Sequence, residues 1–251
     1  MKLTLKIKKM KKIITTATLF ILIAVSCVVL TSCFVNINCE KGNGKIVKQD
    51  RKTDAFSKLE VSGAYSIVLK QDSITSVSVE ADENLQPLII TRTEGNKLII
   101  ESKKPICSSK GLTVNITTPN ISGIDLSGEA DLKTLNKLTS KELNIDISGM
   151  GNLILDLDVK NLEISCSGSG DLNLKGNAEK VNAELSGAAD IRAFELAAKD
   201  FKLTSSGAGK ADLDVTDKLD VDISGAASVL YKGNPTVSQS ISGVGSVKKA
   251  D

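Results

Sequence analysis

The chain has 251 residues, of which 41% are hydrophobic and 25% charged, and its formal net charge is +2. The near-neutral charge and the 3% of aromatic residues argue against a nucleic-acid partner, which needs a basic face and aromatic stacking surfaces. The sequence contains no histidine, the commonest general base and transition-metal ligand, so we predict no catalytic residues, no metal site and no cofactor.

The N-terminal segment has the three parts of a bacterial secretion signal. Lys11 and Lys12 precede an almost wholly apolar run, Ile13 to Leu30, and the tetrapeptide LTSC then ends at Cys33. LTSC resembles the lipobox, whose cysteine is acylated and becomes the new N-terminus. We therefore expect a lipoprotein signal peptide over residues 1–32, lipid attachment at Cys33 and a tether over residues 33–45.

Two alternatives stay open for this segment. The apolar run is long enough to span a bilayer as a retained anchor, and AVSC, ending at Cys27, is a rival acylation site. Lipidation at Cys33 predicts a cell-envelope protein held to the membrane by acyl chains, with its body in water. We expect the outer membrane and leave open whether the body faces the periplasm or the exterior.

Removal of the signal leaves three cysteines, Cys39, Cys107 and Cys166. An odd number in an oxidising compartment allows one disulfide and one free thiol. Cys39 and Cys107 are the candidate pair because both lie in polar, loop-like sequence, and three unpaired thiols are the alternative. Their spacing matches no zinc or redox motif.

From Ile46 onward, β-branched runs alternate with turn signals rich in Asp, Asn, Gly and Pro. The turn around Gly95 suits a hairpin. Only FELAAKD, residues 194–200, looks helical, so we predict an all-β chain. The first runs are KLEVSGAYSIVLKQ, SVSVEAD, PLIITRT, NKLIIES and LTVNITT.

A Ser-Gly-x-small motif then recurs every 18 to 21 residues. Its serines, here called the corner serines, are Ser127, Ser148, Ser167, Ser186, Ser206, Ser224 and Ser242. The residue before each serine is mostly apolar: Leu126, Ile147, Cys166, Leu185, Ser205, Ile223 and Ile241. The third residue after each serine, the small column, is Ala130, Gly151, Gly170, Ala189, Gly209, Ala227 and Gly245. The fifth, the core column, is Leu132, Leu153, Leu172, Ile191, Ala211, Val229 and Val247.

Apolar residues at odd offsets indicate strands with one buried face. A unit of about 19 residues cannot bury that face alone, so stacked units predict a parallel β-helix with one repeat per coil. The glycine after each serine suits a tight bend with an unusual φ, so the motif marks a corner. The Asn/Cys ladder that is typical of leucine-rich repeats is absent from this sequence, and the strict columns argue against a β-sandwich.

The fourth residue after each corner serine, the rim column, carries the candidate chemistry: Asp131, Asn152, Asp171, Asp190, Lys210, Ser228 and Ser246. SGSGDLNL, from Ser167, resembles a calcium-binding nonapeptide, but the period of about 19 and Lys210 favour solvated carboxylates. No cluster of Asp with Arg stands out. A Ser-Lys pair is the only nucleophile arrangement left open.

The chain resembles the family "putative auto-transporter adhesin, head GIN domain" over residues 42 to 247. GNGKIVKQDRKTDAFSKLEVSGAYSIVLKQ, VSVEADENLQPLIITRTEGNKLIIES and the Ser-Gly repeats carry the resemblance. It implies a right-handed parallel β-helix, assigned here to residues 46–247, and an adhesion or binding role. Cys107 and Cys166 depart from the family pattern, and Cys166 is expected to be a buried thiol because it occupies an inward column.

We therefore expect a lipid-anchored, non-enzymatic adhesion or binding protein. Its partners would be the membrane, through the lipid anchor, and a protein or glycan in the periplasm or outside the cell. A carbohydrate-active β-helix enzyme and a structural scaffold of an envelope complex are the alternatives. The enzyme would need acids to converge with Arg or Lys in one groove, so the surroundings of Asp131, Asp171 and Asp190 discriminate between them.

Overall fold

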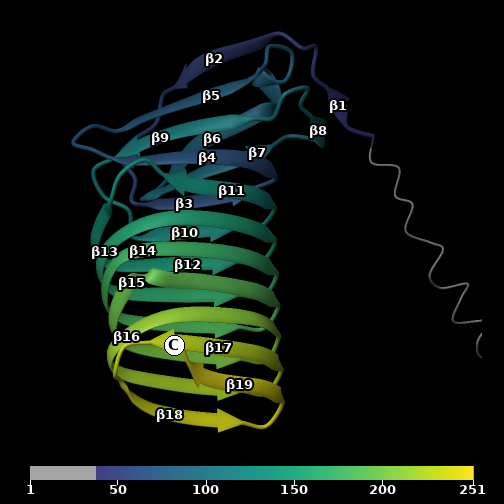
Figure 1. Ribbon diagram of the computed structural model, residues 1–251. Helices are drawn as coiled ribbons and strands as arrows, with labels where there is room; N and C mark the ends of the chain where they lie inside the picture. Colours follow the sequence, from purple (N-terminus) through teal and green to yellow (C-terminus); the bar gives the residue numbers. More distant parts are fainter. Residues whose placement is uncertain (1–37, 251) are drawn as a thin grey trace, which may run out of the picture. The chain divides into compact units, whose positions relative to one another are not determined.

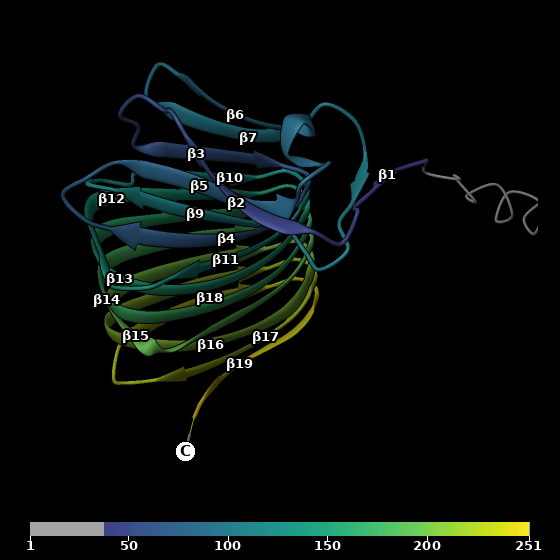
Figure 2. The same cartoon turned by 90° about the horizontal axis from the view of Figure 1, so that it is seen from above.

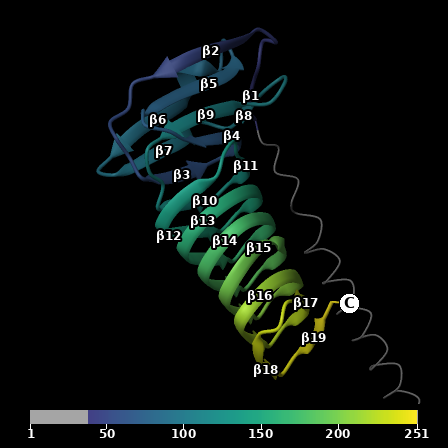
Figure 3. The same cartoon turned by 60° about the vertical axis from the view of Figure 1, so that its left-hand side comes forward.

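The structure is a computed structural model that describes residues 38–250. The predicted signal peptide and the predicted lipid attachment site, Cys33, lie outside the described residues. From Cys39 onward the chain forms one unit, and in it the described residues are almost entirely extended strand. Figures 1 and 3 show this unit as a stack of coils that runs from the strands before residue 119 to the C-terminal strands.

The first part of the unit mixes antiparallel and parallel strands. It contains β1 (Glu40–Lys41), β2 (Ile46–Arg51), β3 (Lys58–Ser62), β4 (Ala64–Gln71), β5 (Ser76–Asp82), the 3-10 helix η1 (Gln86–Leu88), β6 (Ile89–Glu94), β7 (Lys97–Ser102), β8 (Ile106–Cys107) and β9 (Thr113–Thr118). β2 with β5, β5 with β9 and β6 with β7 are antiparallel, whereas β3 with β7 and β4 with β9 are parallel. Gly95, at φ +60°, makes the expected hairpin turn between β6 and β7.

The second part is a parallel ladder throughout. Its strands are β10 (Gly123–Leu126), β11 (Glu129–Thr134), β12 (Leu138–Ile147), β13 (Met150–Cys166), β14 (Ser169–Leu185), β15 (Ala188–Ser205), β16 (Ala208–Ile223), β17 (Ala226–Lys232), β18 (Thr236–Ile241) and β19 (Val244–Lys249). Each long strand pairs in parallel with the next coil, which confirms the predicted parallel β-helix. Figure 2, turned by 90°, shows the strands of successive coils lying over one another.

The register of the ladder confirms the predicted columns. Gly151 pairs with Gly170 in the small column, and Leu153 pairs with Leu172 in the core column. The same alignment holds at the earlier and later coils. The core column is buried from Leu132 to Val229, so each coil contributes one layer to a continuous apolar interior.

The alternation of buried and exposed residues breaks at matching positions of β13 and β14. Lys160 and Asn161 in β13, and Glu179 and Lys180 in β14, are consecutive exposed residues. Because alternation is the signature of a flat strand, these pairs mark a second corner of the coil, distinct from the Ser-Gly corner.

The FELAAKD segment is extended and lies within β15, not in a helix. The pairing of β15 with β16 shifts between Ala193 and Ala197, as expected for a bulge that absorbs extra residues. The bulge explains why this repeat is longer than its neighbours without loss of register at the next corner.

The glycine after each corner serine is required for a reason other than the predicted one. These seven glycines lie outside the left-handed φ range, so the expected unusual φ is wrong. A Cβ on Gly187 would instead meet the carbonyl oxygen of Gly168, and a Cβ on Gly207 that of Gly187, well inside van der Waals contact. Glycine is needed because the corner backbones of successive coils stack in direct contact.

An eighth corner precedes the seven that the sequence reveals. Val61 pairs with Leu126 and Ala64 with Glu129, so Ser62–Gly63 lies in register with Ser127–Gly128. The hydroxyls of Ser62 and Ser127 are 2.6 Å apart. This corner is hard to see in the sequence because 65 residues separate the two serines and because Tyr65 occupies its small-column position.

Cys166 is buried in the inward column before its corner, as expected, and it is the free cysteine of the described residues. At the last coil the same column reaches the surface, because Ile241 is 39% exposed. β18 and β19 each pair on one side within the described residues.

Candidate functional site

The Ser-Gly corners bring three columns together along one edge of the coil stack. The second residue after each corner serine forms a wall column, which is exposed throughout: Glu129, Met150, Ser169, Ala188, Ala208, Ala226 and Val244. The wall, small and rim columns line two hollows of about 540 and 550 Å³. The hollows share Asp190 and Gly209, so they join into one feature, the corner trough, which follows the stack from Glu129 to Ser246.

The small column forms the floor of the corner trough. A Cβ on Gly170 would point inward, 3.2 Å from Cδ1 of Leu172 and 3.3 Å from Sγ of Cys166. Larger floor residues would therefore compete with the core for space. Because its residues are small, the floor lies deeper than the wall column on one side and the rim column on the other.

The rim column is polar and faces solvent, as its register predicts. Arg192 Nη2 lies 2.9 Å from Asp171 Oδ1 and 3.8 Å from Asp190 Oδ2. The backbone N–H of Lys210 donates a hydrogen bond of 2.8 Å to Asp190 Oδ1. The expectation that no Asp clusters with Arg is therefore wrong: Arg192 pairs with Asn173 across the coils, which brings its side chain beside both carboxylates.

These contacts bear on the two kinds of site that the sequence raises here, a calcium site and a Ser-Lys nucleophile. Within residues 38–250, no three His, Cys, Asp or Glu side chains gather closely enough to hold a metal ion, and the acid of the SGSGDLNL motif, Asp171, has a guanidinium as its partner. The corner serines are exposed, and no hydrogen bond joins one of them to a lysine in the described part of the chain.

A larger hollow of about 990 Å³ lies along the second corner. Val159, Ala178 and Ala198 are buried beneath it, and its charged lining comprises Lys141, Lys160, Lys199, Glu142, Asp158 and Glu179. The sequence reading missed this groove, although paired exposed residues that interrupt the alternation are its signal. Its lysines and carboxylates balance in number, so its charge selects no class of ligand.

An acidic ladder lies on the face between the two corners. Glu60 on β3, Asp125 on β10 and Asp146 on β12 are register partners on adjacent strands, and Lys97 Nζ is 2.6 Å from Glu60. Burial, followed by the neighbouring carboxylates of Glu60 and Asp146, raises the pKa of Asp125 above its ordinary value, and Lys97 offsets part of this. The carboxylates repel one another across the coils.

The tether region ends in an ordered structure. Cys39 and Cys107 form a disulfide with their Cα atoms 5.6 Å apart, and Figure 2 shows β1 at the side of the stack. Among the described residues no helix is both long and apolar enough to cross a membrane. Cys33 and the predicted signal peptide lie before this part of the chain.

The stacked parallel coils with their repeated corners define a β-helix protein. The chain belongs to the family described as "Putative auto-transporter adhesin, head GIN domain", whose model matches residues 55–235. This confirms the family resemblance in the sequence.

Solved structures support the same grouping. A "putative adhesin" from Bacteroides fragilis is 27% identical, with a TM-score of 0.78 and coverage of 84% of this chain and 99% of that one. A "putative adhesin" from Parabacteroides merdae is 25% identical, with a TM-score of 0.68 and coverage of 84% and 98%. A "putative lipid binding protein" from Parabacteroides distasonis shares the fold at 22% identity, with a TM-score of 0.67 and coverage of 84% and 99%. No curated protein matches the chain.

Proposed function

We propose that this protein is a lipid-anchored, non-enzymatic adhesion protein of the cell envelope, which binds a protein or glycan along the corner trough. The observation that carries the proposal is the register of the trough. Wall, floor and rim positions repeat coil after coil, which suits contact with an extended partner over many weak points.

The proposed anchor is the acylated Cys33, and the outer membrane is the proposed location. The complete signal before Cys33 supports this, and so does membership in an adhesin family. Metabolic labelling with a clickable fatty acid should mark the wild type and a Cys27→Ala control, but not Cys33→Ala. Labelling of Cys33→Ala would contradict the proposed anchor. In a separate experiment, protease shaving of intact cells would show whether the body faces the periplasm or the exterior.

The non-enzymatic role is supported by the rim chemistry and by the relatives. Asp171 and Asp190 do meet an arginine, Arg192, as the enzyme alternative requires, but all three side chains lie on an exposed rim, where a catalytic acid would gain little from water exclusion. Two of the solved relatives are each described as a "putative adhesin". Glycan and protein arrays probed with the protein freed of its acyl chains should give retained, saturable binding. Turnover of a polysaccharide at enzyme-like rates would contradict the proposal.

A pair of variants on one strand tests the trough itself. Ser169 in β14 belongs to the wall column, and Asn173, four residues later, is also exposed but lies beyond the trough. Ser169→Arg should weaken binding to the strongest array hit at least about tenfold, because a bulky charge fills the trough. Asn173→Arg should leave it unchanged. Equal loss in both variants would place the binding surface elsewhere.

A further inference from the structure

Residues 39–45 run along two loops that come much later in the chain. The disulfide joins Cys39 to Cys107 over a sequence separation of 68. Directly after Cys39, the N–H of Glu40 donates to the carbonyl of Pro105 and the N–H of Gly42 to that of Cys107, both at 2.9 Å. Lys104 Nζ is 2.7 Å from Glu40. The short β1–β8 pair is thus fixed by covalent, backbone and ionic contacts together.

Asn84 and Asp82 hold the next residues. The side-chain amide of Asn84 donates to the carbonyl of Lys41 at 2.8 Å and accepts from the N–H of Asn43 at 2.9 Å, as a neighbouring strand would. Asp82 is fully buried and accepts from the N–H of Gly44 at 2.7 Å.

The same carboxylate holds the loop after β8. Asp82 accepts from Ser108 Oγ at 2.8 Å, from Ser109 Oγ at 2.6 Å and from the N–H of Ser109 at 2.9 Å. A Cβ on Gly42 would overlap the Asp82 carboxylate, so glycine is required where the chain crosses it. Asp82 therefore ties the entering chain and the disulfide loop to the end of β5.

Beyond these contacts, β2 is held on one edge only. Gln86 adds side-chain hydrogen bonds, donating to the carbonyl of Val47 at 2.9 Å and accepting from Arg51 at 2.6 Å. Every side chain of β2 is exposed or half-buried, and within the described residues β2 pairs only with β5. An antiparallel edge strand without buried side chains is expected to open at low cost. A pull on the chain before Cys39 would peel β2 away first if nothing upstream intercepted the force.

We infer that residues 39–45, with Cys107 and Asp82, form a force-transmitting clamp. Tension on the chain before Cys39 passes through the disulfide to Cys107 and bypasses β2 to β7. The clamp protects the antiparallel end of the β-helix while an anchored protein holds its partner. Its biological use rests on the proposed anchoring, but its mechanical behaviour does not.

Single-molecule pulling on the full chain, with coupling tags at its two ends, tests the clamp. The oxidised protein should show no low-force event before the main unfolding. Cys107→Ser should show an early, low-force release of β1 and β2. Its fully extended length should also be greater by about 240 Å, which is the sequence separation of 68 at roughly 3.5 Å per residue.

Reductant supplies the matched control. It should convert wild-type traces to those of Cys107→Ser and leave the traces of Cys107→Ser unchanged. An early event in the oxidised wild type, or no early event in Cys107→Ser, overturns the clamp. Hydrogen exchange gives a second readout: the β2 amides should exchange at least about tenfold faster in Cys107→Ser, and equal rates overturn the inference. Fatty-acid labelling of Cys33→Ala would overturn the anchor alone and leave these results standing.

Discussion

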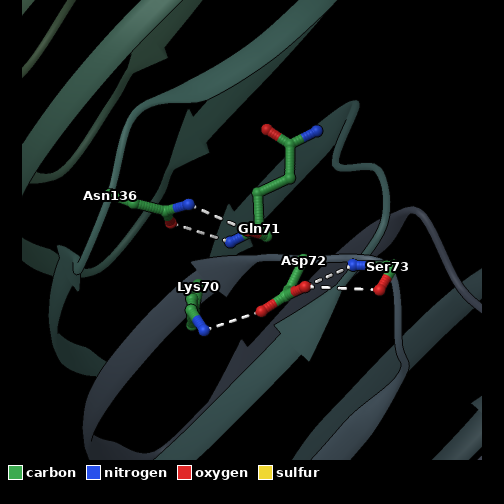
Figure 4. Close-up of polar contacts among 5 residues, drawn as sticks. All are labelled: Lys70, Gln71, Asp72, Ser73 and Asn136. Atoms are coloured by element: carbon green, nitrogen blue, oxygen red, sulfur yellow. Dashed lines mark hydrogen bonds and ion pairs between the residues drawn. The ribbon is translucent and has the colours of Figure 1, made fainter.

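The side-chain amide of Asn136 pairs with both backbone groups of Gln71. Asn136 Oδ1 accepts from the N–H of Gln71 at 3.0 Å, and Asn136 Nδ2 donates to the carbonyl of Gln71 at 2.8 Å (Figure 4). The side chain of Gln71 in turn donates to the carbonyls of Pro119 and Thr139 and accepts from the N–H of Thr139. The side chain of Asn136 thus takes the place of backbone where β11 ends, so that the hydrogen bonding of β4 extends to Gln71.

Variants at Asn136 test whether its side chain stabilises the fold by bonding the backbone of Gln71. Asn136→Ala removes two hydrogen bonds from exposed backbone groups, which water can replace in part, so the free energy of unfolding should fall by about 1 kcal/mol. Asn136→Asp should cost at least as much, because it places a carboxylate against the Gln71 carbonyl. Asn173→Ala, which removes an exposed side chain without hydrogen bonds among the described residues, is the control and should stay within about 0.5 kcal/mol. Urea unfolding measures all three, and an unaffected Asn136→Asp would contradict the pairing.

The stacked glycine corners predict severe damage from the smallest substitution. A Cβ on Gly187 would overlap the carbonyl oxygen of Gly168, and backbone on both sides cannot move without separating the coils. Gly187→Ala should therefore cost about 3 kcal/mol or more. At Gly123 a Cβ meets only the flexible side chain of Lys58, at 3.2 Å, so Gly123→Ala should cost less than about 1 kcal/mol. Similar costs in the two variants, measured by urea unfolding, would mean that the corners are not in contact.

Three consecutive residues in β14 test the register of the coil. Leu172 is 0% exposed, so Leu172→Ala should cost about 2–5 kcal/mol through lost burial and a cavity. Gly170→Val should cost about 1–3 kcal/mol, because the floor already lies against Leu172 and Cys166. Asp171→Ala should stay within about 0.5 kcal/mol, since its pair with Arg192 is exposed on both sides. Urea midpoints in which Asp171→Ala resembles Leu172→Ala would show that the register is shifted.

The columns could be predicted because strand alternation and a steady period leave one consistent alignment. Leu153, Leu172 and Ile191 are apolar at the same offset from their serines, and burial of all three follows from that pattern alone. Ser62–Gly63 could not be recognised in this way, because the segment between it and Ser127 contains antiparallel pairs, β5 with β9 and β6 with β7, that interrupt the period.

The candidate site was less accessible to sequence reasoning. The position of Arg192 beside Asp171 and Asp190 depends on coil-to-coil register and on the reach of a long side chain. A constant offset from the corner serine places each residue in a column, but it does not show which residues of neighbouring columns form ion pairs. The glycines after the corner serines show the same limit: a bend and a close backbone approach both demand glycine, and only the structure separates them.

The acidic ladder predicts that the ionised carboxylate of Asp125 lowers the free energy of unfolding. The pKa of Asp125 is raised by burial, then by Glu60 and Asp146, so the folded state binds this proton more tightly than the unfolded state does. The ionised side chain is therefore destabilising above its folded pKa, and this penalty disappears as the pH falls below its ordinary pKa. Asp125→Asn should unfold at a higher urea concentration than wild type at pH 7, and the gain should shrink at pH 4. Asp158→Asn on the exposed second corner is the control, and a gain that grows as the pH falls would contradict the ladder.

Asp82 predicts the opposite dependence on pH. Hydrogen bonds from the side chain and then the backbone of Ser109, joined by those of Ser108 and Gly44, hold the pKa of Asp82 well below its ordinary value of 3.8. The stabilisation from its ionised form is therefore complete above that ordinary value and is lost as the pH falls towards the lower, folded pKa. Asp82→Asn places an N–H group among donors that already point at this site, so it should lower the urea midpoint at pH 7 and loosen residues 39–45 in hydrogen exchange. The difference from wild type should narrow below pH 3.8, whereas the exposed Asp54→Asn control should match wild type throughout. A midpoint for Asp82→Asn equal to that of the wild type at pH 7 would show that this buried carboxylate does not hold the N-terminal segment in place.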